Sequence, residues 1–266
     1  MTDGYSKYIK PYKLQSDWIV LLVIITSVLE VTNLFDFHWK NFDMIAFIQA
    51  RMSSRRLPRK SLMSIAGRPM LYWVINNVRK SLLANDVIVL TSTEMDDNKI
   101  EAFCSQEGVK CIRGDLTNVH SRFLSALSET GVQAFVRISG DSPLIDPDLI
   151  DQAIAMYQEN AVDIVTNTSP RSFPKGQSIE VINSQALFKL SDYNLTFEEK
   201  EHVTLGIYNR ATEFEIKNFK NAVDYSTVQL SIDSHHDLEL MKKIFKRRKN
   251  EQLSWKKALT LSYHQK

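Results

Sequence analysis

Short apolar runs alternate with segments whose apolar residues recur at helical spacing along the chain from Met44 onward. The runs read as strands because they are apolar along their length, as buried strands of parallel sheets are. They are MIAFI (44–48), DVIVLT (86–91), VKCI (109–112), AFVRIS (134–139) and VDIVTN (162–167). This alternation of strand and helix predicts a Rossmann-like α/β fold, with a mostly parallel sheet that helices cover on both faces.

The rhythm changes after Asn167, where a loop rich in proline and glycine occupies residues 169–176. Further strand-like runs follow at 177–182, 214–219 and 228–232, and a helical pattern runs from about 236 to 248. We therefore expect one domain over residues 44–250, with a mixed sheet and a small inserted lobe of strands and helices at 170–225. Residues 251–266 form a basic C-terminal tail, which we expect to be a solvated helix end.

Residues 1–43 do not fit this pattern and are expected to be an N-terminal extension of unknown role. They contain the uncharged run WIVLLVIITSVL (18–29), which is well short of the about 20 residues that a membrane-spanning helix needs. The following EVTNLFDF offers no convincing cleavage site for a signal peptide. Two interpretations of this run remain open. It could be a short buried or interfacial helix, or part of an extension upstream of a natural start at Met44. We expect no stable membrane span.

Composition adds limits on function and location. A formal net charge of only +2 argues against a dedicated nucleic-acid-binding protein. Cys104 and Cys111 are the only cysteines, which is too few for a disulfide scaffold and suits the reducing cytoplasm. No paired cysteine and histidine spacing typical of structural zinc is present. The chain is therefore expected to be a cytoplasmic protein that binds no nucleic acid.

Positive charge is nevertheless concentrated in QARMSSRRLPRK, residues 49–60, which follows the first predicted strand and contains no acid. In an open parallel sheet, ligands bind at the carboxyl ends of the strands, where the strand order reverses. The loop should therefore line a ligand cleft, beside the loop GDSPLID that follows the AFVRIS strand. A solvated basic surface is the alternative for such a cluster of charge.

Two aspartates should face this loop. Asp141 follows the AFVRIS strand, and Asp233 ends the apolar run VQLSI. Cations opposite two carboxylates suit a polyanion with a bound metal, because Mg2+ is held by one or two carboxylates together with phosphate oxygens. A nucleoside triphosphate is the expected ligand, although either aspartate could instead cap the helix that follows it. Neither a Walker A sequence nor GxGxxG is present.

These motifs resemble a known family. QARMSSRRLPRK followed by AGRPML, then RISGDSPLID, PKGQSIEV, EKEHVT and SIDSHHDLEL, are similar to the sugar cytidylyltransferases. The resemblance is strongest to the spore coat polysaccharide biosynthesis branch, whose relatives include the acylneuraminate and ketodeoxyoctonate enzymes. It extends from Met44 to about Phe245. It implies a GT-A-type nucleotidyltransferase that transfers CMP from CTP to an acidic sugar, releases pyrophosphate and forms a homodimer.

The resemblance also implies roles for individual residues. Arg51, Lys60 and Asp141 would be catalytic, and Asp141 and Asp233 would hold Mg2+. The residues that would contact the nucleotide are Ala50, Arg51, Ser53, Arg56 and Lys60, with Thr91 and Ser92 near the base. The sugar would contact Gln177, Glu180 and His202, with Lys175 beside them. The sequence departs from the pattern at Arg59, where glycine is common, and at His235-His236, where Pro-Glu is usual.

The general base is not evident, although His202 could serve as one instead of binding the sugar. Two other classes of protein remain as alternatives. A GT-A-like glycosyltransferase would need a DxD-type metal motif, and GDS supplies one acid. A nucleic-acid-binding protein would need aromatic residues between the basic ones of the loop, and the loop has none.

Overall fold

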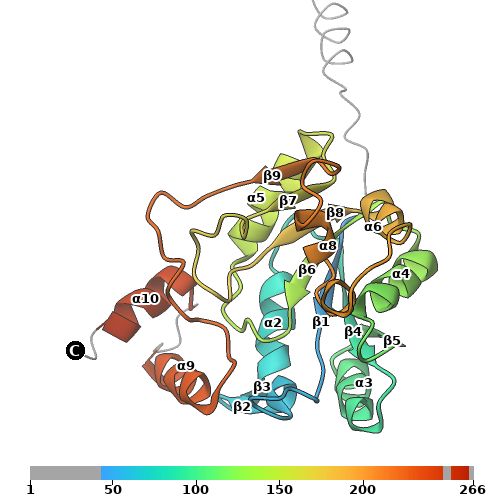
Figure 1. Ribbon diagram of the computed structural model, residues 1–266. Coiled ribbons are helices and arrows are strands. Elements are labelled where there is room, and N and C mark those ends of the chain that lie inside the picture. The colour runs from blue at the N-terminus through green and yellow to red at the C-terminus, as the bar shows by residue number, and fades with distance from the viewer. Residues whose placement is uncertain (1–42, 248–252, 264–266) are drawn as a thin grey trace, which may run out of the picture. The chain divides into compact units, whose positions relative to one another are not determined.

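The computed structural model describes residues 43–247 and 253–263, so the apolar run at 18–29 lies outside the described residues. A sheet of seven strands forms its centre, in the order β5-β4-β1-β6-β8-β7-β9 (Figure 1). The strands are β1 (Ile45–Gln49), β4 (Asp86–Ser92), β5 (Lys110–Gly114), β6 (Ala134–Ser139), β7 (Ile164–Thr166), β8 (Glu180–Asn183) and β9 (Ile216–Asn218). The predicted mixed and mostly parallel sheet is confirmed.

Strand order reverses at β1. The chain passes from β1 outward to β4 and β5, and then returns to place β6 on the other side of β1. All of these pairings are parallel, and Gln49 at the end of β1 lies between Leu90 of β4 and Ser139 of β6. The carboxyl ends of β1 and β6 therefore flank the switch point where α/β sheets bind their ligands.

Helices cover both faces of the sheet, as Figure 1 shows. Alternate residues of β1 belong to different cores, because successive side chains of a strand point to opposite faces. Ala46 and Ile48 pack with the helices α2 (Met70–Val78), α3 (Asn98–Gln106), α5 (Pro147–Gln158) and α9 (His235–Arg247). Phe47 packs with α4 (Val119–Thr130), α6 (Ser184–Leu190) and α8 (Leu205–Tyr208). Both cores are fully buried at the centre of the sheet.

Three segments differ from their predicted form. Within residues 170–225, where the inserted lobe is expected, β8 pairs antiparallel with β6 and β9 pairs with β7, so both strands extend the main sheet. Residues 228–232 are not a ladder strand and make one bridge, from Gln229 to Lys175. The described part of the tail is not only a solvated helix end, because α10 (Trp255–Tyr263) packs one face on the domain and buries Trp255 in the first core.

Within the described residues, no helix is both long enough and apolar enough to cross a membrane.

Candidate active site

The ends of β1 and β6 touch directly at the switch point. The backbone nitrogen of Gly140 donates to the carbonyl of Gln49 at 2.9 Å, and that of Ala50 donates to Leu90 at 3.0 Å. A β-carbon on Gly140 would lie 2.8 Å from the Gln49 carbonyl oxygen, closer than such contacts allow. Glycine at this position lets the loop after β1 and the loop carrying Asp141 open side by side into one cleft.

The basic loop is held in place by hydrogen bonds to its backbone. The carboxylate of Asp97 accepts from the backbone nitrogens of Met52 (2.7 Å) and Ser92 (3.1 Å). The backbone nitrogen of Arg59 donates to the Met52 carbonyl at 2.7 Å. Arg59 itself has a φ of 63°, in the left-handed region that favours glycine. This backbone conformation fits the glycine that the resemblance implies at this position.

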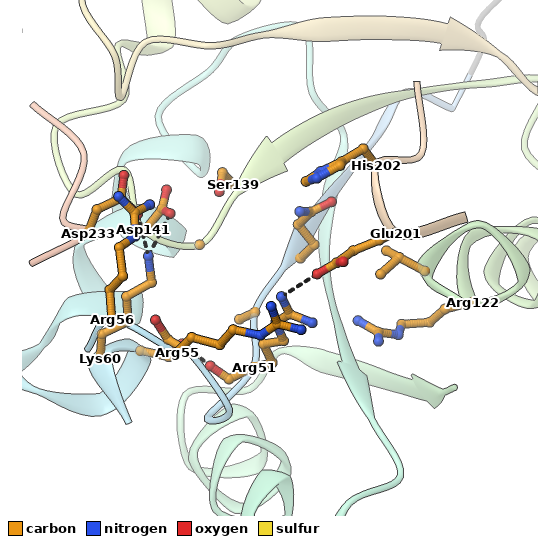
Figure 2. Close-up of a pocket in the computed structure, with 16 residues that line it drawn as sticks. Arg51, Arg55, Arg56, Lys60, Arg122, Ser139, Asp141, Glu201, His202 and Asp233 are labelled. Atoms are coloured by element: carbon orange, nitrogen blue, oxygen red, sulfur yellow. Dashed lines mark hydrogen bonds and ion pairs between the residues drawn. The ribbon is translucent and has the colours of Figure 1, made fainter. Parts of the chain in front are cut away.

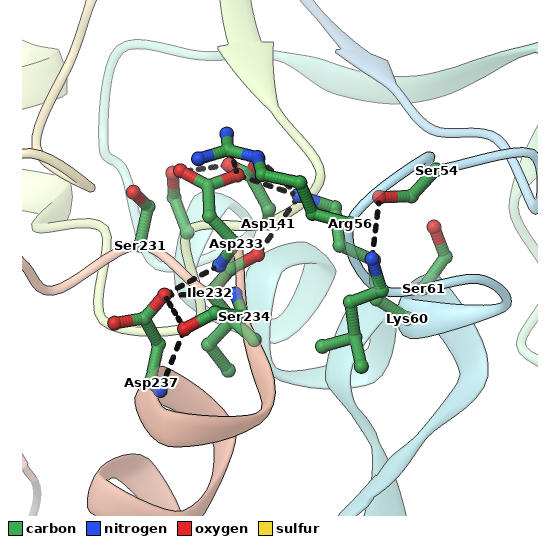
Figure 3. A network of polar contacts seen from close by, with 12 residues as sticks. Ser54, Arg56, Lys60, Ser61, Asp141, Ser231, Ile232, Asp233, Ser234 and Asp237 are labelled. Atoms are coloured by element: carbon green, nitrogen blue, oxygen red, sulfur yellow. Dashed lines mark hydrogen bonds and ion pairs between the residues drawn. The ribbon is translucent and has the colours of Figure 1, made fainter.

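Lys60 joins the two aspartates that the sequence analysis singled out (Figure 3). It begins a short 3₁₀ helix, Lys60–Leu62. Its Nζ lies 2.9 Å from Oδ2 of Asp141, 3.1 Å from Oδ1 of Asp233 and 2.8 Å from the Ile232 carbonyl. Burial opposes the charge of Asp233, yet the hydrogen bond and charge of Lys60, with Arg56 nearby, hold the pKa of that carboxyl below its usual range.

The donor set fits a divalent cation that is shared with a ligand. One carboxylate oxygen from each aspartate lies within 3.1 Å of a single nitrogen atom, so both acids converge on one cationic position. Within residues 43–247 and 253–263, no group of three or more acidic, histidine or cysteine side chains could hold a metal. Mg2+ is usually held by one or two carboxylates, with phosphate oxygens and waters completing its coordination shell.

A cleft of about 450 Å³ opens beside this cluster, and Figure 2 shows the side chains that line it. Positive charge comes from Arg51, Arg55, Arg56, Lys60 and Arg122. Glu201, the last residue of α7 (Phe197–Glu201), and His202, which follows it, face these cations. Nη2 of Arg51 lies 2.9 Å from Oε1 of Glu201, and this hydrogen bond lowers the pKa of the glutamate below its usual range. The cleft is built to receive several negative charges.

Arg122 is a cleft residue that the sequence analysis did not identify. It lies in the first turn of α4, only 2% exposed, and donates to the carbonyls of Asp115 and Leu116. Burial lowers the pKa of Arg122 to about 10, so the guanidinium is still charged at neutral pH. The described residues include no acid in a salt bridge with it. Its signal in the sequence is an arginine on the apolar face of a helix, between Val119 and Phe123.

Four of the predicted contact residues do not face the cleft. Thr91 and Ser92 are completely buried, and the Ser92 hydroxyl donates to Asp97, which holds the backbone of the basic loop at Met52. Ser53 is exposed, and its neighbour Ser54 lines the cleft instead. Gln177 is completely buried, because it donates to the Leu144 carbonyl at 2.7 Å and accepts from the Asp146 nitrogen at 3.0 Å. Its role is to fix the loop after Asp141.

Glu180 and His202, predicted to bind a sugar, lie at a second cavity of about 260 Å³. His202 lines both this cavity and the larger cleft. The helix before His202, α7, begins with a capping box between Thr196 and Glu199. The hydrogen bond from Arg210 lowers the pKa of Glu199 to about 2. The segment that carries Glu201 and His202 is therefore anchored, and it separates two adjacent cavities.

Comparison with known proteins agrees with this geometry. The spore coat polysaccharide biosynthesis protein SpsF of Bacillus subtilis is 29% identical over 212 residues, covering 77% of this chain and 87% of that protein. The 3-deoxy-manno-octulosonate cytidylyltransferase of Bdellovibrio bacteriovorus is 31% identical over 142 residues, which is 52% of this chain and 56% of that enzyme.

Solved structures show the same fold. A cytidylyltransferase from Leptospira borgpetersenii superposes with a TM-score of 0.79 at 27% identity, covering 83% of this chain and 94% of that one. A CMP:2-keto-3-deoxy-manno-octonic acid synthetase complexed with CTP gives a TM-score of 0.60 at 18% identity, covering 77% and 99%. The family described as cytidylyltransferase matches residues 45–264. The predicted resemblance and fold are thus confirmed, and this chain belongs to the cytidylyltransferase family.

Proposed function

We propose that this enzyme transfers CMP from CTP to a hydroxyl group of an acidic sugar and releases pyrophosphate. The hydroxyl oxygen forms a bond to the α-phosphorus, the bond from that phosphorus to the pyrophosphate oxygen breaks, and the hydroxyl proton is released. The observation that carries the proposal is the convergence of Lys60, Asp141 and Asp233 at the edge of an arginine-rich cleft. In a cytidylyltransferase, such a cleft is suited to a metal-bound triphosphate.

The basic loop would hold the triphosphate. Arg51, Arg56 and Lys60 line the cleft beside the backbone of Ala50, and Arg122 adds a buried charge at its far wall. Pyrophosphate gains negative charge as it leaves, so cations fixed around it stabilise the transition state more than the bound substrate. Before the ligand arrives, Lys60 and Arg51 are held at the cleft by carboxylates, and they would exchange these partners for phosphate oxygens when it binds. We assign Arg51, Lys60 and Asp141 as catalytic on this basis.

Asp141 and Asp233 would hold the metal, and we propose Mg2+. When bound, the ion would neutralise phosphate charge and make the α-phosphorus more electrophilic. The two aspartates would fix its place at the end of β6, next to the cleft. Lys60, which contacts both acids, would then turn its ammonium toward the phosphate oxygens.

The sugar would enter through the second cavity, where Glu180 and His202 lie. An acid is supported by the relative named for 3-deoxy-manno-octulosonate, and a role in surface polysaccharide synthesis by the relative named for spore coat polysaccharide. We further propose that the enzyme works in the cytoplasm, where CTP is made, and as a homodimer, as the resemblance implies. Sedimentation velocity of the purified chain tests the second point.

Pyrophosphate release tests the proposal. The full chain is incubated with Mg2+, each of the four nucleoside triphosphates, and either 3-deoxy-manno-octulosonate or a neutral hexose. We expect release with CTP and the acid only. Asp141→Asn and Lys60→Ala should lose most of this activity while remaining folded, and Asp96→Asn, which alters an exposed aspartate paired with Lys99, should retain it. Equal release with neutral sugars, or full activity in Asp141→Asn, would contradict the proposal.

A further inference from the structure

The second cavity contains a guanidinium group that is only partly satisfied. Nη2 of Arg171 donates to the Ser178 hydroxyl at 3.0 Å. Its other terminal nitrogen, Nη1, is buried and has no hydrogen-bond partner within the described residues. A buried donor without a partner is costly in a folded protein, and more so when it carries charge. Such an atom beside a cavity indicates that a ligand supplies the missing acceptor.

The acid of the cavity is already engaged elsewhere. The carboxylate of Glu180 forms an ion pair with Arg137 and accepts hydrogen bonds from Thr204, at 2.9 Å, and from the Tyr208 hydroxyl. These three partners use most of the hydrogen-bond acceptor capacity of the Glu180 carboxylate. Among the described residues, no hydrogen bond joins Glu180 to Arg171. Burial lowers the pKa of Arg171, while the negative charge of Glu180 partly opposes that effect. The cavity therefore keeps one positive charge without a direct anionic partner.

The position of this charge relates it to the reaction. His202 lines both this cavity and the triphosphate cleft, and Arg137 of β6 lines this cavity beside Arg171. The Arg137 Nε also donates to Gln49, another cleft residue, at 3.0 Å. Arg171 thus lies in a cavity that adjoins the triphosphate cleft, so an acceptor bound there would lie next to the nucleotide.

We propose that Arg171 binds the carboxylate of the acidic acceptor and determines the preference for acids. This inference rests on the proposed function. A guanidinium matches a carboxylate with two parallel hydrogen bonds, and Nη1 supplies a donor that no protein group uses. In the ring form of a 2-keto sugar acid, the carboxylate and the anomeric hydroxyl are attached to the same carbon. Holding the carboxylate at Arg171 would therefore select which hydroxyl reaches the α-phosphorus.

The test compares two acceptors that differ only in charge, 3-deoxy-manno-octulosonate and its C1 carboxamide. We expect the unaltered enzyme to prefer the acid at least 100-fold in kcat/KM. Arg171→Gln should lower kcat/KM for the acid at least 30-fold, change that for the carboxamide less than threefold, and leave the KM for CTP within twofold. Arg171→Lys should recover part of the preference. Arg79→Gln, an exposed arginine at the end of α2, is the control and should behave as the unaltered enzyme.

Calorimetric binding of the acid, with an α,β-methylene analogue of CTP present, separates this inference from the proposed function. If Arg171→Gln retains the preference for the acid, or loses both acceptors equally, the assignment of Arg171 is wrong while CMP transfer stands. If the unaltered protein binds the acid, Arg171→Gln does not, and no pyrophosphate is released, the assignment stands and the proposed function fails. If the unaltered protein neither binds nor uses the acid, both fail.

Discussion

Lys60 donates a hydrogen bond of 2.9 Å to Asp141, and the same nitrogen contacts Asp233 at 3.1 Å. The lysine side chain is 13% exposed, so its charge is poorly screened by solvent. An ammonium group therefore occupies the position on which the two carboxylates that we propose as metal ligands converge. A divalent cation can bind there only when the ammonium moves, and a triphosphate gives it a new anionic partner. Metal and nucleotide should therefore bind cooperatively.

Lys60→Met should raise the affinity of the nucleotide-free protein for a divalent cation, because the two carboxylates lose their internal counter-charge. Mn2+ serves as the probe ion, and its binding is measured by electron paramagnetic resonance. We expect it to bind about tenfold more tightly, which corresponds to about 1.4 kcal/mol. CTP should bind at least tenfold more weakly, because the same variant removes a cation from the cleft.

Lys99→Met is the matched control, since Lys99 is an exposed lysine paired with Asp96 on the surface. Both affinities should be unchanged in that variant. If Lys60→Met binds Mn2+ no better than the control, the lysine does not compete for the metal position.

The ion pair between Arg51 and Glu201 predicts competition of a second kind. Glu201→Gln should strengthen CTP binding up to about fivefold, because Arg51 no longer has to leave a carboxylate to reach the phosphates. The effect is bounded at about 1 kcal/mol, since the side chains are 36% and 24% exposed. Arg51→Gln should weaken CTP binding at least tenfold. Calorimetry of both single variants and the double variant measures this coupling: in the Arg51→Gln background, Glu201→Gln should have no effect. An equal gain in both backgrounds would mean that Glu201 acts on the whole cleft and not through Arg51.

The part of the site that follows from the order of strands and loops along the chain could be predicted from the sequence. Parallel strands end at one edge of a sheet, so the loops after the strands that became β1 and β6 had to be neighbours. Their cations and Asp141 are brought together, with Asp233 joining them through Lys60. The parallel strands could be predicted because they are buried on both faces, so each one is a run of residues that is apolar along its length.

The roles of single polar residues could not be predicted, because they depend on which partner reaches them in the fold. Ser92 at a strand end looks like a ligand contact until Asp97 is found to accept its hydrogen bond. Arg122 was missed for the opposite reason, since an arginine in a helical pattern is read as part of the solvated face. Residues 228–232 alternate like a strand, but their partner is the irregular loop before β8, with which they form a single bridge.

Gln177 should be needed for stability and not for sugar affinity. Gln177→Met keeps a similar volume but leaves the buried Leu144 carbonyl and Asp146 nitrogen without their partner. Each such group costs about 1–3 kcal/mol, so the free energy of unfolding should fall by about 2 kcal/mol or more in urea titrations. The KM for the sugar should change less than twofold below the transition. Gln106→Met, which alters an exposed glutamine at the end of α3, is the control. A raised KM with unchanged stability would restore Gln177 to the sugar site.

Histidine 120 should make the folded protein less stable as the pH falls. His120 is buried in α4 with its Nε2 3.1 Å from the Ser191 hydroxyl, and burial lowers its pKa from 6.5 to about 4. Since the unfolded chain binds a proton below pH 6.5 and the folded chain does not until about pH 4, stability is fully present above pH 6.5. It is lost progressively between these values, by up to about 3 kcal/mol.

This loss can be measured by urea unfolding at pH 7.5, 6, 5 and 4.5 in the unaltered protein and in His120→Gln. The substitution can lower stability at every pH, so the informative quantity is the change with pH. We expect the slope between pH 6.5 and 4.5 to be smaller in His120→Gln by about 1.4 kcal/mol per pH unit, the value for one proton. His236→Gln removes an exposed histidine and should keep the slope of the unaltered protein. Parallel slopes in all three proteins would show that His120 is protonated in the folded state as readily as in the unfolded one.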